Sequence, residues 1–535
     1  MPKKAPPEVI IEPLLDRDIR RISPAIDIID GKGAVGVWIP CSITTKTEDN
    51  TQQRIDYMPY FVTDDKKLIL IDERLWKKGY VLASEPVPIE PRWAICDIRD
   101  YLTDGGTLSA TEIFQEVLSQ WVEYIEFTDE REYIFRTLWD IGTYFHHLFN
   151  AYIYDYLGGV KQTGKTKVLT LHSCIAFNAV NSGNLSTASV FRLVQNGRCT
   201  LLIDETEMLR AEGRNVPERA YEIRNLLLSG YKKGSYVYRC EKTGKDRIVP
   251  EKFEVYGPKA LANIRGLEGV LEDRCKVTIM QRARGEKRNR EIDIADPKWA
   301  KLRDKLYRFY LGNWKRVSEI YASLGGVDSE LTEGCELGGR ERELWKPILT
   351  MALLFNECSE CNVMYKTLGI PPSSQRSFSS LTTLILELAK ESTRLKKTED
   401  VAEVAENILV KVLANRVRDD DYYKVKDLKQ EMGLFYDEQQ LWLTTRWIGN
   451  ALRRLGFREK RRLGTGYEYL IKVQQVHDLV DRLGISTEEI QPKIEKIEDE
   501  KKQAKICDVC GMPATVTSGD RRFCDKCARD FKGDL

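Results

Sequence analysis

The stretch YIYDYLGGVKQTGKTKVLTL, residues 152–171, contains the pattern G-x-x-x-x-G-K-[ST] at Gly159, Gly164, Lys165 and Thr166. An apolar run precedes the pattern, and a run with the composition of a helix follows it. In this order, backbone N–H groups of the loop and of the helix N-terminus can surround a phosphate group. The lysine then reaches the terminal phosphates, and the threonine hydroxyl ligates Mg²⁺. The stretch therefore predicts a phosphate-binding loop for ATP rather than a glycine-rich turn that carries a lysine.

A second signal is CTLLIDE, residues 199–205, in which an apolar run typical of a buried strand ends at two acidic residues. Asp204 can hold the magnesium ion directly or through water, and Glu205 can polarise the attacking water. Taken alone, the run is an ordinary strand that ends in a solvated acidic turn. Together with the loop, it indicates a P-loop ATPase that hydrolyses ATP.

Around these two signals the sequence alternates between strand-like and helix-like runs, which predicts an α/β domain with a mainly parallel sheet. The chain of 535 residues is too long for one ordinary core, so we expect a multidomain protein. The expected parts are a β-rich N-terminal module (1–98), a helical lead-in (99–150), the ATPase core (151–285), a helical lid or bundle (286–395), a winged helix (396–484), a charged linker (485–506) and a zinc ribbon (507–535).

From about residue 145 to residue 350, the chain resembles the AAA+ ATPases. It is most similar to the helicase-like ATPases of plasmids, viruses and other mobile elements, which are related to minichromosome-maintenance and superfamily-three helicases. The resemblance implies a ring of subunits, expected to be a hexamer, because an arginine of one subunit completes the nucleotide site of the next. The segments that carry it are YLGGVKQTGKTK, RCTLLIDE, VYGPKALANIRGL, LEDRCKVTIM and GRERELWKPIL.

The resemblance implies roles for three further residues. Asn263 is implied as the sensor that positions the lytic water, and the alternative is an asparagine satisfied within a loop. Arg274 is implied as the arginine finger that stabilises charge on a neighbour's γ-phosphate. Its alternative is a surface ion pair with one of the two acidic residues before it. Arg340 is implied as a second, lid-borne sensor, although Arg342 competes for that role and a solvated helix start is the alternative.

Residues 234–257, GSYVYRCEKTGKDRIVPEKFEVYG, have the pattern of a β-hairpin, because two alternating runs flank a glycine that permits a tight turn. The pattern places Lys242 and Lys245 at the tip. In the resembled helicases, a hairpin just before the sensor strand lines the central pore and grips DNA. We therefore expect the two lysines to contact phosphates of single-stranded DNA without reading sequence. The alternative is a solvated surface hairpin.

The chain as a whole has 83 Lys or Arg and 82 Asp or Glu, but residues 441–472 carry eight Lys or Arg and two Glu, a net charge of +6. Residues 396–484 follow the order of a winged helix-turn-helix. TTRWIGNALRRLGF would be the recognition helix and REKRRLGTGYEYLI the wing, which together could straddle a groove of duplex DNA. A winged helix for protein contacts is the alternative. The expected DNA contacts are Arg446, Arg453, Arg454, Lys460, Arg461 and Arg462.

Near the end of the chain, CDVC and CDKC form two C-x-x-C pairs separated by thirteen residues. Four thiolates at this spacing can surround Zn²⁺ tetrahedrally with no open position, so we expect a structural zinc site rather than free or redox-active thiols. Zinc binding would supply much of the folding energy of so short a segment. The four cysteines are Cys507, Cys510, Cys524 and Cys527.

The expected cofactors are ATP, Mg²⁺ and Zn²⁺, and the expected partners are DNA and further copies of the chain. The sequence has no apolar run of about 18 residues and no signal-peptide pattern, so we expect a soluble, cytoplasmic protein without a membrane partner. The loop, the acidic pair and the hairpin favour an ATP-dependent DNA motor, and the resemblance implies that it is a replicative helicase or initiator of a mobile element or virus. The alternatives are a DNA-binding AAA+ switch or loader that hydrolyses ATP without unwinding DNA, and a scaffold with a degenerate nucleotide site. The intact loop and acidic pair argue against the scaffold.

Overall fold

The computed structural model describes most of the chain, in two compact units of residues 1–393 and 394–535. Among the described residues, no helix is both long enough and apolar enough to cross a membrane. Those residues are Pro13, Leu15, 18–46, 51–87, 92–106, 108–159, 161–181, 187–204, 218–243, 247–263, 269–283, 287, 289–324, 337–357, 380–403, 405–433, 443–464, 466–483, 516–518 and 521–523.

The centre of the first unit is a five-stranded sheet in which all neighbouring strands are parallel, in the order β13-β7-β12-β9-β8. The parallel α/β sheet predicted from the sequence is therefore confirmed. Because β12 lies between β7 and β9, the carboxyl ends of these three strands are neighbours at one edge. The strands are β7 (Tyr154–Gly158), β8 (Val180–Asn181), β9 (Leu201–Ile203), β12 (Lys259–Ala262) and β13 (Cys275–Ile279).

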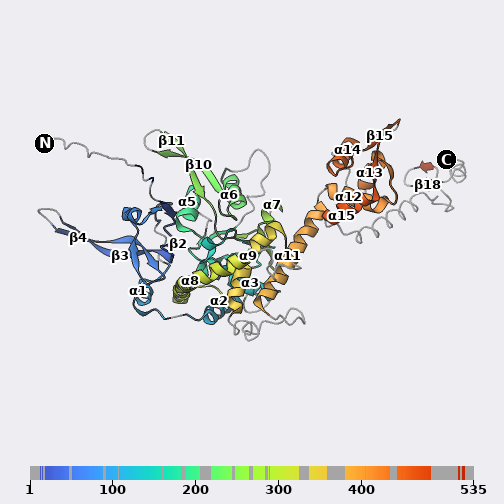
Figure 1. Cartoon of the computed structure of the whole chain (residues 1–535). Helices are drawn as coiled ribbons and strands as arrows, with labels where there is room; N and C mark the ends of the chain where they lie inside the picture. Colours follow the sequence, from blue (N-terminus) through green and yellow to red (C-terminus); the bar gives the residue numbers. More distant parts are fainter. Residues whose placement is uncertain are drawn as a thin grey trace. The chain divides into compact units, whose positions relative to one another are not determined.

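Helices pack on both faces of this sheet, as is usual for parallel sheets; Figure 1 labels α5 and α6 above α8 and α9 in the first unit. Alternate side chains of the strands enter two hydrophobic cores: Leu157 and Leu202 pack with α1–α4, α8 and α9, whereas Tyr156 and Ile203 pack with α5 and α6. The helices are α1 (Ile95–Asp104), α2 (Ala110–Tyr124), α3 (Arg131–Gly142), α4 (Lys165–Ile175), α5 (Thr187–Gly197), α6 (Glu218–Ser229), α7 (Gly269–Glu272), α8 (Pro297–Ser323), α9 (Gly339–Asn356) and α11 (Leu381–Glu403).

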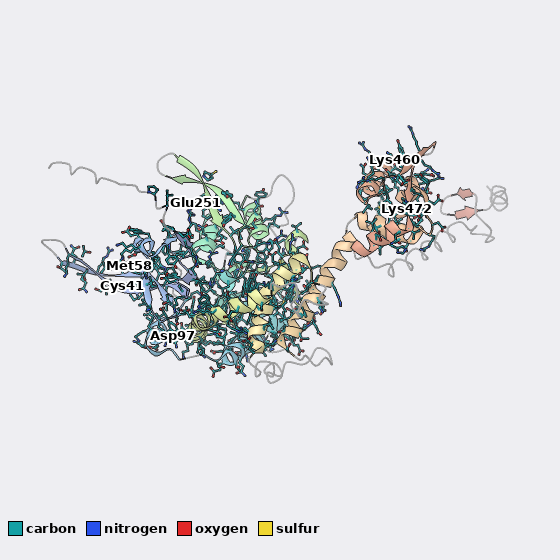
Figure 2. The ribbon with its side chains drawn as sticks, viewed as in Figure 1. Cys41, Met58, Asp97, Glu251, Lys460 and Lys472 are labelled. Carbon is teal, nitrogen blue, oxygen red and sulfur yellow. The ribbon has the colours of Figure 1, made fainter. Side chains whose placement is uncertain are left out.

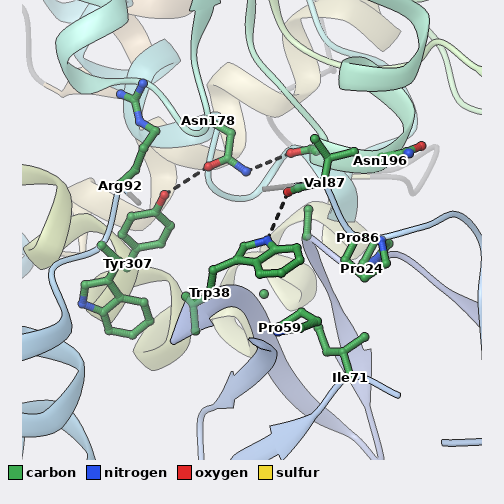
Figure 3. Close-up of a pocket in the computed structure, with 15 residues that line it drawn as sticks. Pro24, Trp38, Pro59, Ile71, Pro86, Val87, Arg92, Asn178, Asn196 and Tyr307 are labelled. Atoms are coloured by element: carbon green, nitrogen blue, oxygen red, sulfur yellow. Dashed lines mark hydrogen bonds between the residues drawn. The ribbon is translucent and has the colours of Figure 1, made fainter. Parts of the chain in front are cut away.

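The N-terminal part is β-rich, as predicted, with a four-stranded sheet in the order β2-β3-β4-β5 and a parallel β1-β6 pair. It packs against α8, where the Trp314 indole Nε1 donates a 2.7 Å hydrogen bond to Asp64. A cavity of about 50 Å³ lies between this part and the helices, lined by Trp38, Arg92 and Tyr307 (Figure 3). It is far smaller than a nucleotide pocket. The strands are β1 (Arg20–Ile22), β2 (Ile26–Ile29), β3 (Lys32–Lys46), β4 (Thr51–Thr63), β5 (Leu68–Leu70) and β6 (Tyr80–Leu82).

The predicted hairpin is present between α6 and β12. Strands β10 (Tyr236–Thr243) and β11 (Arg247–Glu254) pair antiparallel along their whole length. Lys242 is paired with Ile248 in this ladder. Lys245 lies outside the described residues. The hairpin pattern read from the sequence is thus confirmed, whereas the contacts of its two lysines stay a prediction.

Up to β16, the second unit follows the element order predicted for residues 396–484: helix, strand, two helices and two strands. A further helix, α15, was not predicted and follows β16. Its three-stranded sheet has the order β14-β16-β15, and Leu428, Ile448 and Leu452 lie in a core of their own. A separate two-stranded hairpin, β17 (Val516–Ser518) with β18 (Arg521–Phe523), lies between the two C-x-x-C pairs. The other elements are α12 (Ala405–Arg416), β14 (Asp421–Lys424), α13 (Val425–Gly433), α14 (Thr445–Arg454), β15 (Lys460–Leu463), β16 (Gly466–Ile471) and α15 (Val473–Leu483).

Candidate nucleotide site and nucleic-acid interface

The loop between β7 and α4 has the backbone that the glycine pattern demands. Gly159 has a φ of 127° and Gly164 a φ of 86°, in the region that favours glycine. A Cβ on Gly159 would also come within 2.7 Å of the Met280 carbonyl oxygen. Gly164 is the N-cap of α4, so the loop leads directly into the helix N-terminus. This geometry leaves backbone N–H groups of the first helical turn available for an anion.

The lysine and threonine of the pattern occupy the first turn of α4. The buried Lys165 ammonium crosses the loop and donates a 2.7 Å hydrogen bond to the Gly159 carbonyl oxygen. The Thr166 hydroxyl donates a 2.8 Å hydrogen bond to a carboxylate oxygen of Asp204, which follows β9. The structure thus brings the predicted Lys165, Thr166 and Asp204 to one place. Glu205 lies outside the described residues.

Asn263 lies between the loop and Asp204 at the same edge of the sheet. It directly follows β12, its side chain is buried, and its backbone N–H donates a 3.0 Å hydrogen bond to the Leu157 carbonyl oxygen of β7. Strand β12 pairs with β7 on one side and with β9 on the other. In open α/β sheets, ligands bind outside the carboxyl ends of the strands, which is where these residues converge.

These residues fit the groups that the sequence predicts. A hydroxyl and a carboxylate in contact supply the oxygen ligands that Mg²⁺ prefers, and the lysine with the helix N-terminus supplies positive potential for phosphates. The predicted zinc ligands cannot be compared in this way, since Cys507, Cys510, Cys524 and Cys527 lie outside the described residues. No group of three or more His, Cys, Asp or Glu residues suited to a metal ion occurs in the described part of the chain.

Arg274 lies between α7 and β13 and is only 9% exposed. Its Nε donates a 3.1 Å hydrogen bond to the Leu228 carbonyl oxygen, a second nitrogen bonds the Val270 carbonyl, and the guanidinium lies 5.0 Å from the centre of the Tyr231 ring. In the single chain, the predicted finger is therefore held by carbonyls of its own subunit. Arg274 makes no described ion pair with a neighbouring carboxylate, and its side chain is mostly buried.

Arg340 is in the first turn of α9 and has a side chain that is 44% exposed. Its guanidinium forms a 3.1 Å ion pair with Asp273, the residue before Arg274. The two arginines implied by the resemblance are thus brought to neighbouring positions. Of the two, Arg340 is the one that a second molecule could reach without displacing buried contacts.

The sequence analysis missed a buried cluster of charges behind the loop. In α4, both ring nitrogens of His172 face carboxylates: Nδ1 lies 2.7 Å from Asp140 and Nε2 lies 3.1 Å from Asp155. Because a carboxylate only accepts hydrogen bonds, this arrangement favours the doubly protonated imidazolium. Burial acts to lower the pKa of His172, but the two carboxylates outweigh it and raise the pKa to about 8.

Arg136 of α3 completes the cluster from the other side. Its fully buried guanidinium bonds Asp155 at 3.0 Å, the Thr278 hydroxyl of β13 at 2.9 Å and Glu132 at 2.7 Å. Burial acts to raise the pKa of the Asp155 carboxyl, but Arg136, His172 and Lys276 together outweigh burial and lower the pKa. The cluster therefore joins α3, β7, α4 and β13. Its sequence signal is a charged residue within an apolar run, as Asp155 is in YIYDYL.

The far end of α4 is held by two further arginines. Arg92, which precedes α1, donates hydrogen bonds of 2.7 Å to the Ser173 carbonyl oxygen and 3.1 Å to that of Ala179. Arg303 of α8 bonds the Cys174 carbonyl oxygen at 2.9 Å. Positive charge next to the C-terminal carbonyls of a helix is stabilising. The helix that begins at the candidate nucleotide site is thus fixed by ion pairs at its middle and by arginine–carbonyl hydrogen bonds at its end.

In the second unit, α13, α14 and the β15-β16 hairpin surround a cavity of about 680 Å³. Of the predicted DNA contacts, Arg446, Arg453 and Lys460 line it. Arg461 is instead bonded to Glu468 at 2.8 Å, Arg462 is exposed, and the side chain of Arg454 lies outside the described residues. Figure 2 shows Lys460 on this unit. Lys424, Lys426 and Asn450, not predicted from the sequence, also line the cavity.

No protein-family model matches the chain. A search of curated proteins also gives no match. Among solved structures, one described as "SCCmec type IV Cch - active helicase" superposes with a TM-score of 0.36 at 11% identity, over 87% of this chain and 100% of that chain. A full-length MCM homolog from Methanopyrus kandleri superposes with a TM-score of 0.29 at 11% identity, over 71% and 79% of the two chains. These two solved structures are described as a helicase and an MCM homologue. The case for a nucleotide site rests on the loop, the Thr166–Asp204 hydrogen bond and the strand order.

Proposed function

We propose that the chain is an AAA+ P-loop ATPase that uses ATP hydrolysis to move DNA. The observation that carries the proposal is the 2.8 Å hydrogen bond from Thr166 to Asp204, which joins the start of α4 to the end of β9. In P-loop ATPases, a side chain at the start of this helix and one at the end of this strand share a magnesium ion, so the two side chains must lie close together. Strand β12, which Asn263 directly follows, lies between β7, which leads into the loop, and β9.

The residues of the site then have distinct roles. Lys165 leaves the Gly159 carbonyl and pairs with the terminal phosphates, which the N–H groups of the loop and α4 surround. Thr166 and Asp204 would hold Mg²⁺, which would supply positive charge to neutralise the phosphates. Glu205 takes a proton from the attacking water, and the Asn263 side chain orients that water. No covalent intermediate is part of this scheme.

The proposed active assembly is a ring, with six subunits expected from the family resemblance. Arg274 is the proposed arginine finger, and to reach a neighbour's nucleotide its guanidinium must exchange the Leu228 and Val270 carbonyls for the γ-phosphate. Arg340 is the proposed lid-borne residue. Its exposed position beside Asp273 supports a role at a boundary between subunits. The neighbouring positions of the two arginines suit one shared interface.

The proposal also includes two DNA-binding elements. The β10-β11 hairpin precedes the strand of Asn263, so its tip lysines, Lys242 and Lys245, are proposed to hold single-stranded DNA. The second unit is proposed to be a winged helix for duplex DNA, a reading supported by its element order and by the basic cavity beside α14. The β17-β18 hairpin between the cysteine pairs suits a zinc ribbon.

Strand separation on a labelled forked duplex tests the motor directly. The wild-type protein is expected to release the labelled strand only with ATP and Mg²⁺, and Lys165→Ala is expected to abolish release. The double variant Lys242→Ala, Lys245→Ala should lose strand release while it keeps DNA-independent hydrolysis. If the double variant unwinds the duplex at the wild-type rate, the two hairpin lysines do not hold the DNA. Hydrolysis without any strand release would favour the alternative of a DNA-binding loader or remodeller.

A further inference from the structure

The β10-β11 hairpin has one packed face and one open face. On the packed face, Phe253 is buried with its ring 6.0 Å from that of Phe191 in α5. Arg239 lies 4.5 Å from the centre of the Phe191 ring and also pairs with Glu222 of α6. Since side chains alternate along a strand, the residues on either side of Arg239 and Phe253 point away from these helices.

The open face carries two tyrosines and a lysine. Tyr236 is 40% exposed and Tyr238 is 66% exposed. Lys252, on the other strand, is directly opposite Tyr238 in the ladder. Its ammonium lies 3.5 Å from the centre of the Tyr236 ring, a cation–π contact that holds the charge beside the second tyrosine. The most exposed aromatic ring of the hairpin thus has a positioned positive charge as its neighbour.

The described acidic side chains of the hairpin do not compete for this charge. Glu254 shares the open face, but its carboxylate is bound by Arg198 at 3.1 Å. Glu251, labelled in Figure 2, is opposite Arg239 in the ladder and therefore lies on the packed face of the hairpin. An exposed aromatic ring beside a cation suits a partner with flat rings and negative charges. Single-stranded nucleic acid has both in each nucleotide.

We propose that Tyr238 stacks on a base of single-stranded DNA while Lys252 contacts the adjacent phosphate. The inference rests on the proposed function and adds to it, since it places base contacts on the face of the hairpin as well as phosphate contacts at its tip. Tyr236 acts as a positioning residue because its ring holds the Lys252 ammonium. Stacking on a tyrosine tolerates every base, which a motor that moves along any sequence requires.

Binding of two single strands of equal length, an oligothymidylate and an abasic oligonucleotide, tests this proposal in the full-length protein. The wild type is expected to bind the strand with bases more tightly. Tyr238→Ala should weaken binding of that strand roughly five- to hundredfold and leave the abasic strand unaffected. Tyr238→Phe should retain the preference. The matched control Tyr57→Ala, which removes a tyrosine that is 51% exposed on β4, should bind both strands like the wild type.

If Tyr238→Ala weakens binding of both oligonucleotides equally, or weakens binding of neither, the stacking proposal is overturned. A change in the size of the assembly in this variant, measured by light scattering, would also overturn it, because the open face would then be covered by a second copy. The proposed motor would survive each of these results if single strands still stimulate hydrolysis. A wild type that binds neither strand would overturn both the motor and the stacking proposal.

Discussion

At the scale of single residues, the proposed chemistry depends on two side chains that meet across the edge of the sheet. The Thr166 hydroxyl and the Asp204 carboxylate are 2.8 Å apart, so the loss of either would remove a proposed magnesium ligand without removing buried apolar contacts. We expect Asp204→Asn and Thr166→Val each to lower the rate of ATP hydrolysis at least about a hundredfold, the scale of removing one group that stabilises transition-state charge. Steady-state phosphate release measures this.

Lys161 provides the matched control for these variants. It is a second, exposed lysine of the same loop and has no role in the proposed chemistry. Lys161→Ala is expected to hydrolyse ATP at close to the wild-type rate, whereas Lys165→Ala is expected to be inactive. Equal rates in these two lysine variants would show that the loop does not hold phosphates as proposed.

The imidazolium of His172 gives the protein a predicted pH dependence. Its pKa is raised from 6.5 to about 8 in the folded chain, so its contribution to stability is complete below pH 6.5 and is lost as the pH rises through about 8. The shift corresponds to about 2 kcal/mol. The difference in free energy of unfolding between wild type and His172→Gln should therefore shrink by about this amount from pH 6 to pH 9.

Urea titrations of both proteins at several pH values measure this difference. Taking the difference cancels titrations that the two proteins share, such as that of Lys259, whose pKa burial lowers to about 7. A difference that does not change with pH would mean that His172 is neutral in the folded chain. A difference that grows with pH would contradict the direction of the shift.

The sequence predicted those residues of the candidate site that belong to short local patterns. Lys165 and Thr166 follow from local spacing, and Asp204 follows from the end of an apolar run. The buried cluster of Arg136, Asp155 and His172 could not be predicted in the same way, because its members are distant in sequence and become neighbours only when α3, β7 and α4 pack. Their charges within apolar runs were the available signal.

At the scale of elements, the local patterns predicted the parallel strands and the antiparallel hairpin. The local patterns could not predict the order of strands in the sheet, because the position of β12 between β7 and β9 is decided by pairing of segments that are distant in sequence. The segment that joins α7 to β13 shows the same limit. The resemblance named Arg274 there, and only the packing reveals its contacts with the Leu228 and Val270 carbonyls.

The same segment gives a prediction about stability. Arg274→Ala removes buried hydrogen bonds and a ring contact, so it should lower the free energy of unfolding by about 1–3 kcal/mol. Arg340→Ala removes an exposed ion pair and should change it by less than about 1 kcal/mol. Chemical denaturation of the two variants measures both values. An unchanged Arg274→Ala protein would mean that its guanidinium spends little time on these carbonyls.

At the scale of the whole molecule, a ring with shared sites makes a prediction for mixed assemblies. Arg274→Ala subunits have an intact loop, and Lys165→Ala subunits have an intact Arg274. If the arginine acts on the neighbour's nucleotide, a mixture of these two inactive proteins should recover part of the wild-type hydrolysis, because some interfaces combine both intact parts. Co-purification of one variant through an affinity tag carried only by the other shows whether mixed assemblies form. No recovery in such assemblies would contradict the shared site.

The proposed function couples ATP hydrolysis at the loop to movement on DNA. It is tested most directly by the rate of hydrolysis without DNA, with single-stranded DNA and with duplex DNA, with Lys165→Ala and Glu205→Gln as controls. We predict strong stimulation by single strands and no activity in either control. Hydrolysis that is robust but indifferent to DNA would contradict the claim.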